Sequence, residues 1–437
     1  MMVQGQMWTP LRGLRAFSMV TLTVLCLLAG FSGVGKAAGI GLHYTNCIGW
    51  NTADCAEVGS KYLSYADLYI APDDRSAYVL GSSKVALSLS RSRTGQLSFS
   101  SCIATMYRYN SNCRVEGQAP LTNGPAAISP DGLHVYEAGR QVAVSTFRRM
   151  SDGSLRFLGC LAVKGMLGCD NKVRGPIVNV EGIGVGPAGH EVYVGFEDGI
   201  AVYRQPKRGP LVFQSCVAQK KSKCQHVPVK HLGYPTDTFA FSQDGRTVFA
   251  DSGSQVNVFR LSRGGDLRFQ GCVGRPALSD SSCWSPRRGS FSGLSDMEIS
   301  PSGKFLYVSS VGRGSISTFG VGKTGHLKFM DCLGFHGLRG CRSAPQDHLF
   351  RPGKLALAPD GRSLYASLQD SQTVERYDVN KSGNLRFHGC ISSKIDSDCE
   401  YFDGSRAAIT LDAISSDGKS FYFGERGSWS VFGPSPD

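Results

Sequence analysis

The feature that most constrains the fold is a cysteine pattern that repeats seven times along the chain. Of the 15 cysteines, Cys26 stands alone near the N-terminus and the other 14 form close pairs whose first members recur every 55 to 60 residues. Neither C-x2-C spacing nor Cys/His clustering accompanies them, so no metal site is expected. Sequence does not fix connectivity, but pairing within each repeat is the only scheme that treats all seven repeats alike. We therefore predict seven disulfides: Cys47 with Cys55, Cys102 with Cys113, Cys160 with Cys169, Cys216 with Cys224, Cys272 with Cys283, Cys332 with Cys341, and Cys390 with Cys399.

A turn signature recurs with the same period. Proline presets φ for the first turn position, aspartate bonds the local backbone and glycine accepts positive φ, so each copy predicts a tight turn between strands. The copies begin at Ala71-Pro-Asp-Asp, Ser129-Pro-Asp-Gly, Gly186-Pro-Ala-Gly, Ser242-Gln-Asp-Gly, Ser300-Pro-Ser-Gly, Ala358-Pro-Asp-Gly and Ser415-Ser-Asp-Gly.

Four short strands surround each turn. A small apolar strand such as residues 126–128 precedes it, a β-rich strand such as residues 306–308 follows, then an alternating strand, and last a Gly-x-Leu-x-Phe strand as at residues 153–157. Four-stranded units repeated seven times predict an all-β, seven-bladed β-propeller of antiparallel blades, because only a closed ring covers the terminal sheets.

Ring closure is also visible in the sequence. The last unit ends near Phe432 before its fourth strand, whereas residues 41–47 match the missing strand. We expect the N-terminal strand to complete the last blade. Residues 38–437 would then form a single propeller domain.

Residues 1–37 have the composition of a secretory signal peptide. Arg12 and Arg15 precede an apolar run at residues 17–31, small residues follow, and no acid occurs. Cleavage after Ala37 would release a chain without a membrane segment, and an even cysteine count behind such a leader favours a secreted, periplasmic or cell-surface location.

The net charge gives little information about a partner. The chain carries +12 at neutral pH, and the basic residues are scattered, so we interpret the charge as a solubility feature and expect no nucleic-acid partner. Two G-x-G-x-x-G matches, at residues 184–189 and 320–325, fall on predicted turns with no helix after them, so no nucleotide cofactor is expected. No G-x-S-x-G or H-E-x-x-H motif occurs.

Ligands of propellers usually bind where the innermost strands begin. Alignment on the repeated turn brings a set of acids and one lysine to that rim, and the loops between second and third strands add further charges, including Asp198, Asp251 and Asp370. Convergent carboxylates near a cation can serve as general acid and base. Candidate catalytic residues are Asp67, Asp296, Glu181 and Asp237. Candidate ligand-binding residues are Lys354, Arg313, Arg140, Arg426 and Asp412.

The repeat pattern of residues 300–329 resembles the lactonase-like seven-bladed propeller family, which includes 6-phosphogluconolactonases and carboxymuconate cyclases and is related to YVTN-type propellers. The Gly-Cys at Gly159-Cys160 and Gly271-Cys272 resembles an exported, Cys-paired subgroup. Active members tend to carry Gly-Pro-Arg-His at the start of an inner strand, where this chain has Gly124-Pro-Ala-Ala and Arg351-Pro-Gly-Lys.

Two functions follow as expectations. The first is an extracellular binding scaffold, a monomer whose top face holds an extracellular protein, a glycan or a small anionic ligand. The alternative is a divergent lactonase, either a hydrolase or a cycloisomerase, that uses the rim carboxylates. Whether the chain is an enzyme stays open at the level of sequence.

Overall fold

The computed structural model divides the chain into Met1–Gly33 and Val34–Asp437, and all described residues lie in the second unit. They are residues 36–37, 40–49, 55–58, 66–81, 85–105, 113–115, 121, 124–139, 143–162, 169, 180–220, 223–227, 238–274, 283–286, 291, 293–345, 348–369, 372–393, 399–402, 410–425 and 427–434. Cys26 and the predicted leader up to residue 35 fall outside them.

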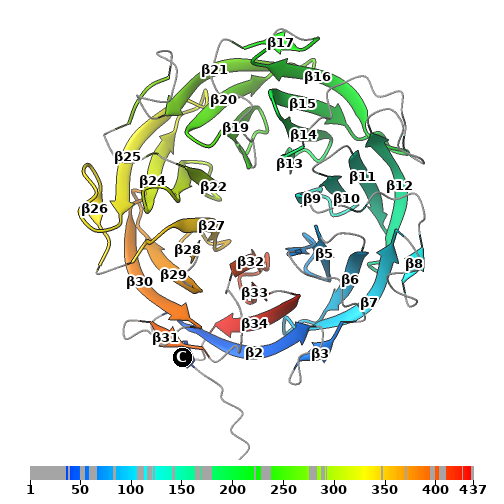
Figure 1. The fold of residues 1–437 in the computed structure, drawn as a ribbon, viewed down its shortest axis with the longest axis horizontal. Helices are drawn as coiled ribbons and strands as arrows, with labels where there is room; N and C mark the ends of the chain where they lie inside the picture. The colour runs from blue at the N-terminus through cyan, green and yellow to red at the C-terminus, as the bar shows by residue number, and fades with distance from the viewer. Residues whose placement is uncertain are drawn as a thin grey trace, which may run out of the picture. The chain divides into compact units, whose positions relative to one another are not determined.

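Seven β-sheets follow one another around a ring (Figure 1). Each has four antiparallel strands, and in most a two-residue strand runs parallel to the outermost one. Blade 1 contains β4 (Asp67–Ile70), β5 (Ser76–Leu80), β6 (Val85–Arg91), β7 (Leu97–Ala104) and β8 (Arg114–Val115). Blade 2 contains β9 (Ala126–Ile128), β10 (His134–Gly139), β11 (Ala143–Arg149) and β12 (Leu155–Ala162). Blade 3 contains β13 (Gly182–Val185), β14 (Glu191–Phe196), β15 (Gly199–Arg204), β16 (Val212–Ala218) and β17 (Gln225–His226).

The next three blades repeat this plan. Blade 4 contains β18 (Phe239–Phe241), β19 (Thr247–Asp251), β20 (Gln255–Leu261) and β21 (Leu267–Gly274). Blade 5 contains β22 (Leu294–Ile299), β23 (Phe305–Ser310), β24 (Ser315–Val321), β25 (Leu327–Gly334) and β26 (Arg342–Ser343). Blade 6 contains β27 (Pro352–Leu357), β28 (Ser363–Leu368), β29 (Thr373–Val379), β30 (Leu385–Ser392) and β31 (Glu400–Tyr401).

Blade 7 joins the two ends of the chain, as predicted. Its inner strands are β32 (Thr410–Ile414), β33 (Phe421–Glu425) and β34 (Ser428–Pro434), and β2 (Leu42–Gly49) pairs antiparallel with β34 from Leu42 opposite Pro434 to Gly49 opposite Ser428. Two short strands, β1 (Lys36–Ala37) and β3 (Ala56–Glu57), flank β2. β1 lies inside the predicted leader of residues 1–37.

The repeated turns adopt the geometry that their sequence predicts. In blade 2 the Ser129 hydroxyl accepts a hydrogen bond from the backbone of His134 at 2.9 Å, and Asp131 accepts one from Leu133 at 2.9 Å. Gly132 has a φ of 67°, which favours glycine over residues with a Cβ.

All seven predicted disulfides are formed, one per blade. In each blade the first cysteine lies on the outermost strand, and in the blades other than blade 2 the second directly precedes the short segment that pairs with that strand. The disulfides therefore fasten the outer rim of the ring. Seven of them fit an oxidising compartment.

Between the blades lies an apolar core, in which the second and third strands of every sheet are buried. Buried tyrosines bridge neighbours: the Tyr78 hydroxyl donates to the Gly153 carbonyl at 2.9 Å and the Tyr422 hydroxyl donates to the Gly95 carbonyl at 2.9 Å. Among the described residues there is no helix of the length and apolar character that a membrane crossing requires.

The strand directions define two faces of the ring. We call the face where the innermost strands begin the entry face, and the face that carries the Pro-Asp-Gly turns the turn face. The candidate residues Asp67, Asp296, Lys354 and Asp412 all lie at or near the beginning of an innermost strand, on β4, β22, β27 and β32.

Candidate functional site

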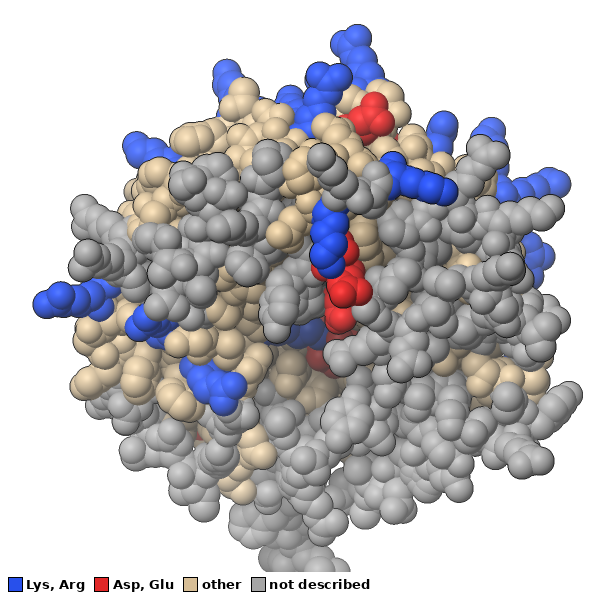
Figure 2. Space-filling view, turned by 45° about the horizontal axis from the view of Figure 1, so that its top comes forward, with Lys and Arg blue, Asp and Glu red and all other residues tan. Residues whose placement is uncertain are grey.

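The innermost strands surround a central cavity of about 550 Å³. Its wall includes Asp67 and Tyr69 of β4, Asp296 and Glu298 of β22, and Lys354 of β27. In Figure 2 acidic side chains lie in the hollow near the middle of the visible face, with Lys or Arg side chains beside them, and further Lys and Arg are spread over the surrounding surface. The cavity thus gathers three residues that the sequence analysis nominated, from blades 1, 5 and 6.

Lys354 lies between two carboxylates. Its Nζ is 3.2 Å from an Asp67 oxygen and 3.4 Å from an Asp412 oxygen. Burial alone would lower the pKa of Lys354, but the negative charges of Asp412 and Asp67 outweigh it and raise the pKa. The lysine is therefore a permanent cation at the cavity wall.

Asp412 is the buried member of this trio, with a side chain only 3% exposed. Its Oδ2 accepts hydrogen bonds from Trp429 Nε1 at 2.8 Å and from the Leu68 backbone at 3.3 Å. Burial raises its pKa to about 6, against the opposing effect of Lys354. Asp412 thus connects blade 7 to Leu68 of blade 1 and to Lys354 of blade 6.

Asp296 and Glu298 form a second pair of carboxyl groups in the wall. Asp296 accepts hydrogen bonds at 2.8 Å from the backbone nitrogens of Leu355 and Met297. Burial raises the pKa of Asp296 to about 6, and burial together with the charge of Asp296 raises that of Glu298 to about 8. At neutral pH the pair therefore offers one ionised carboxylate and one protonated carboxylic acid.

Glu298 and Tyr69 were missed by sequence reasoning, which followed only the first residue of each inner strand. Side chains two residues apart on a strand share a face, so Glu298 follows Asp296 into the cavity and Tyr69 follows Asp67. Burial and the nearby Asp67 raise the pKa of Tyr69, which is therefore a neutral phenol. The two-residue periodicity of side chains along a β-strand was the sequence signal that could have identified both residues.

Other nominated residues lie elsewhere. Arg313 is exposed in the β23–β24 turn, and neither it nor Glu181 is part of the cavity wall. Asp198 pairs with Lys220 at 2.8 Å, and Asp251 accepts a backbone hydrogen bond from Thr238 at 3.1 Å. Asp237, Arg140, Arg426 and Asp370 lie outside the described residues.

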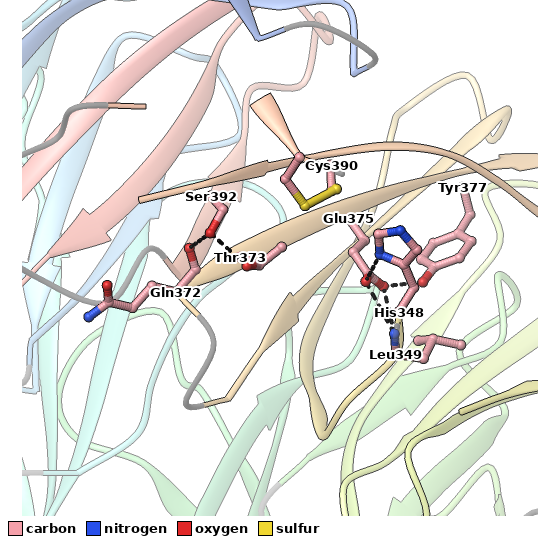
Figure 3. Close-up of a disulfide and its surroundings, with 9 residues drawn as sticks. His348, Leu349, Gln372, Thr373, Glu375, Tyr377, Cys390 and Ser392 are labelled. Atoms are coloured by element: carbon pink, nitrogen blue, oxygen red, sulfur yellow. Dashed lines mark hydrogen bonds and ion pairs between the residues drawn. A yellow bond between two sulfur atoms is a disulfide. The ribbon is translucent and has the colours of Figure 1, made fainter. Parts of the chain in front are cut away.

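A buried polar cluster in blade 6 supports the segment that leads to Lys354 (Figure 3). The Glu375 carboxylate accepts the Leu349 backbone N–H at 3.1 Å, bonds His348 Nδ1 at 2.9 Å and accepts the Tyr377 hydroxyl. Leu349 has a φ of 65°, which is strained for a branched side chain. Glu375 holds this strained segment just before β27 begins.

The same region contains the one described group with metal-ligand proximity. Ligand atoms of His348, Cys390 and Cys399 lie within 4.8 Å of one another. Cys390 and Cys399 are joined in a disulfide, and metal binding by cysteine requires the thiolate. The cluster is therefore structural while the disulfide is intact.

Comparison with known proteins supports the propeller assignment. Residues 238–394 match the family model described as "Lactonase, 7-bladed beta-propeller". No curated protein is detectably similar in sequence.

Solved structures share the fold at low identity. The periplasmic gluconolactonase PpgL of Pseudomonas aeruginosa is 21% identical, with 75% of this chain and 85% of that chain covered and a TM-score of 0.52. A putative 6-phosphogluconolactonase from Bacteroides fragilis is 16% identical, with coverage of 76% and 83% and a TM-score of 0.50. The β-propeller domain of Cps50 (Swd1) from Myceliophteria thermophila is 12% identical, with coverage of 90% and 99% and a TM-score of 0.56. These similarities establish the fold, and any catalytic activity must be argued from the residues of the site.

Proposed function

We propose that this chain, a disulfide-stapled propeller of the lactonase type, hydrolyses a lactone in its central cavity. The observation that carries the proposal is the pair formed by Asp296 and Glu298, whose pKa values are raised to about 6 and about 8. Two neighbouring carboxyl groups that differ in protonation at neutral pH can divide the roles of general base and general acid.

The roles follow from the charges. Ionised Asp296 would accept a proton from a water molecule as its oxygen attacks the lactone carbonyl, and the Lys354 ammonium would stabilise the resulting oxyanion. Protonated Glu298 would then donate its proton to the ring oxygen as the carbon–oxygen bond breaks. The product is an open hydroxy acid, and proton transfer from Asp296 to Glu298 restores the starting state.

Lys354 lies in the segment where this chain differs from the Gly-Pro-Arg-His pattern of active family members. It is the fourth residue of Arg351-Pro-Gly-Lys, the segment that corresponds to Gly-Pro-Arg-His in active members. A cation thus occupies the histidine position, but it cannot act as a neutral base because Asp67 and Asp412 keep it charged. We therefore assign proton transfer to the carboxyl groups of β22.

The test is a pH-stat assay of the oxidised protein on a panel of sugar lactones and carboxylated lactones. We expect ring opening that Asp296→Asn reduces by at least about a hundredfold, in line with the usual contribution of a general base. Glu181→Gln is the matched control, since Glu181 precedes an innermost strand but does not line the cavity. Equal activity in the two variants would refute the assignment of Asp296.

The second candidate is the binding scaffold, favoured by the loss of the arginine and histidine from the Gly-Pro-Arg-His position. In this proposal the entry face captures an extracellular protein, a glycan or a small anionic ligand. A complete lack of turnover over the lactone panel would favour it. Both candidates place the chain outside the cytoplasm, where disulfides persist.

A further inference from the structure

A groove on the turn face, between blades 1 and 2, combines positive charge with apolar surface. It has a volume of about 690 Å³, and four arginines line it against two aspartates. The exposed side chains of Leu133 and Met150 flank it, at 46% and 37% exposure. This groove lies at the opposite end of the strands from Asp67 and Lys354.

Three basic side chains stand in a row across blade 2 beside this groove. His134 of β10 lies directly opposite Arg148 of β11, which lies directly opposite Arg156 of β12. Residues paired in this way point to the same face of a sheet, about 4.8 Å apart from strand to strand. We call these residues the basic row.

Such a row is unfavourable in the isolated protein, because like charges directly opposite one another repel. Burial lowers the pKa of His134 against the opposing charge of Asp131, and the positive charge of Arg148 lowers it further. The repeat does not require the row, since the corresponding residues of blade 1 are Ser76, Ser90 and Ser98. Blade 4 has arginines at the last two of these positions, Arg260 and Arg268, but threonine at the first. The complete basic row is thus not a requirement of the fold.

Both acids of the groove are already engaged. Asp73 binds Arg149 Nη2 at 2.7 Å, and Asp152 accepts hydrogen bonds from the Ser154 backbone at 2.9 Å and its hydroxyl at 2.7 Å. The other three arginines of the groove, Arg75, Arg148 and Arg156, are exposed. Their guanidinium groups are therefore available to bind an anion from outside the protein.

We propose that this groove binds a carboxylated polysaccharide, with uronate carboxylates on Arg148, Arg156 and Arg75. Arginine binds carboxylate through two parallel hydrogen bonds. Arg148 and Arg156 lie on neighbouring strands, so their guanidinium groups can bind carboxylates on successive sugar residues. Leu133 and Met150 offer apolar contact to sugar rings. The groove lining contains no aromatic side chain on which nucleic-acid bases could stack. Attachment through the turn face would leave the entry face open.

The experiment measures binding of oxidised protein to polygalacturonate oligomers by calorimetry at low and at moderate salt. We expect binding that weakens as salt rises and that Arg148→Ser with Arg156→Ser weakens about tenfold. Serine is the residue that blade 1 carries at the equivalent positions, so the double variant should fold, and its melting temperature checks this.

Arg268→Ser is the matched control, because Arg268 occupies in blade 4 the position of Arg156 and pairs with Arg260 across the sheet. It should change the affinity less than twofold. Absence of polygalacturonate binding, or equal loss in the control and the double variant, would overturn the proposal. It would also be overturned if single-stranded DNA or anionic lipid vesicles bound more tightly than polygalacturonate and lost affinity in the double variant.

Discussion

At the scale of single residues, the site depends on carboxyl groups with unequal surroundings. Asp67 is 46% exposed and Asp412 only 3%, although both pair with Lys354. Asp296 and Glu298 share a strand face but differ in pKa, because burial alone raises that of Asp296 whereas burial and the charge of Asp296 together raise that of Glu298. Residue type alone would have made these four acids equivalent.

The pH dependence of the proposed activity follows from this inequality. Asp296 must be ionised to act as base, so kcat/KM should rise as pH increases through about 6, and Glu298 must be protonated to act as acid, so it should fall through about 8. Because the two groups interact, these are apparent values of the pair. Glu298→Gln should abolish the alkaline limb and keep the acid limb. A wild-type profile that stays flat from about pH 5 to about pH 9, with neither limb, would contradict the assignment.

Asp412 should matter for stability more than Asp67. Asp412→Ala leaves the Trp429 indole N–H and Lys354 without a buried partner, so we expect a loss of about 2 to 4 kcal/mol in the free energy of unfolding. Asp67→Ala removes an exposed ion pair and should cost below about 1 kcal/mol. Urea unfolding at pH 7 compares the two variants, and equal losses would contradict the buried role of Asp412.

At the scale of the strand and the blade, the pairing of the third and fourth strands has a common irregularity. The register shifts between Thr146 and Phe147 in blade 2 and between Val258 and Phe259 in blade 4, opposite Gly159 and Gly271. Both glycines have φ near 145°, at 144° and 146°. The extra residue of each β-bulge, Leu158 or Gln270, thus lies on the outer strand directly before the Gly-Cys sequence. The bulge raises local twist, and each cysteine follows it on the same strand.

Each disulfide should contribute independently to stability. Replacing Cys160 and Cys169 by serine opens a loop of 9 residues, for which the chain-entropy model gives a loss of about 2.5 kcal/mol. The same change at Cys216 and Cys224, separated by 8 residues, should cost nearly the same. Guanidinium unfolding measures both; no loss in either variant would show that the outer rim does not depend on its disulfides.

At the scale of the whole ring, closure between blades 7 and 1 brings in contacts beyond the β2–β34 pairing. Asp74 accepts the backbone N–H of Ser416 at 2.9 Å, and Arg91 Nε donates to the Tyr422 hydroxyl at 2.5 Å. Asp74 replaces the turn glycine in blade 1 and adopts a φ of 57°. Its carboxylate thus compensates for the strain by joining two blades.

Removing the closing strand tests the ring as a unit. A chain that begins at residue 59 lacks β2 and leaves the hydrogen-bonding edge of β34 open, so we expect loss of cooperative thermal unfolding and aggregation. Addition of a peptide of residues 40–58 should restore the cooperative transition measured by circular dichroism. A chain that begins at residue 38 is the control. An unchanged transition in the shorter chain would contradict a closing role for β2.

The sequence alone determined the architecture, because its signals are local and repeated. The Ser129-Pro-Asp-Gly turn depends on bonds within five residues, each cysteine bonds a partner at most 11 residues away, and residues 41–47 match a strand missing from the last unit. Because each of these patterns occurs in several repeats, the repeats support the same interpretation of the fold. The same periodicity also located Asp67, Asp296, Lys354 and Asp412 at the beginnings of inner strands.

Only the tertiary structure decided which of these residues act together. Ring closure brings blades 1, 5, 6 and 7 around one axis, so Lys354 pairs with Asp67 and Asp412 and lines the same cavity as Asp296. Glu181 and Arg313 were nominated from comparable positions of the repeat, but neither lines the cavity. The raised pKa values of Asp296 and Glu298 depend on burial, and the basic row depends on strand register. Burial and register are properties of the packed blades, so no local pattern encodes them.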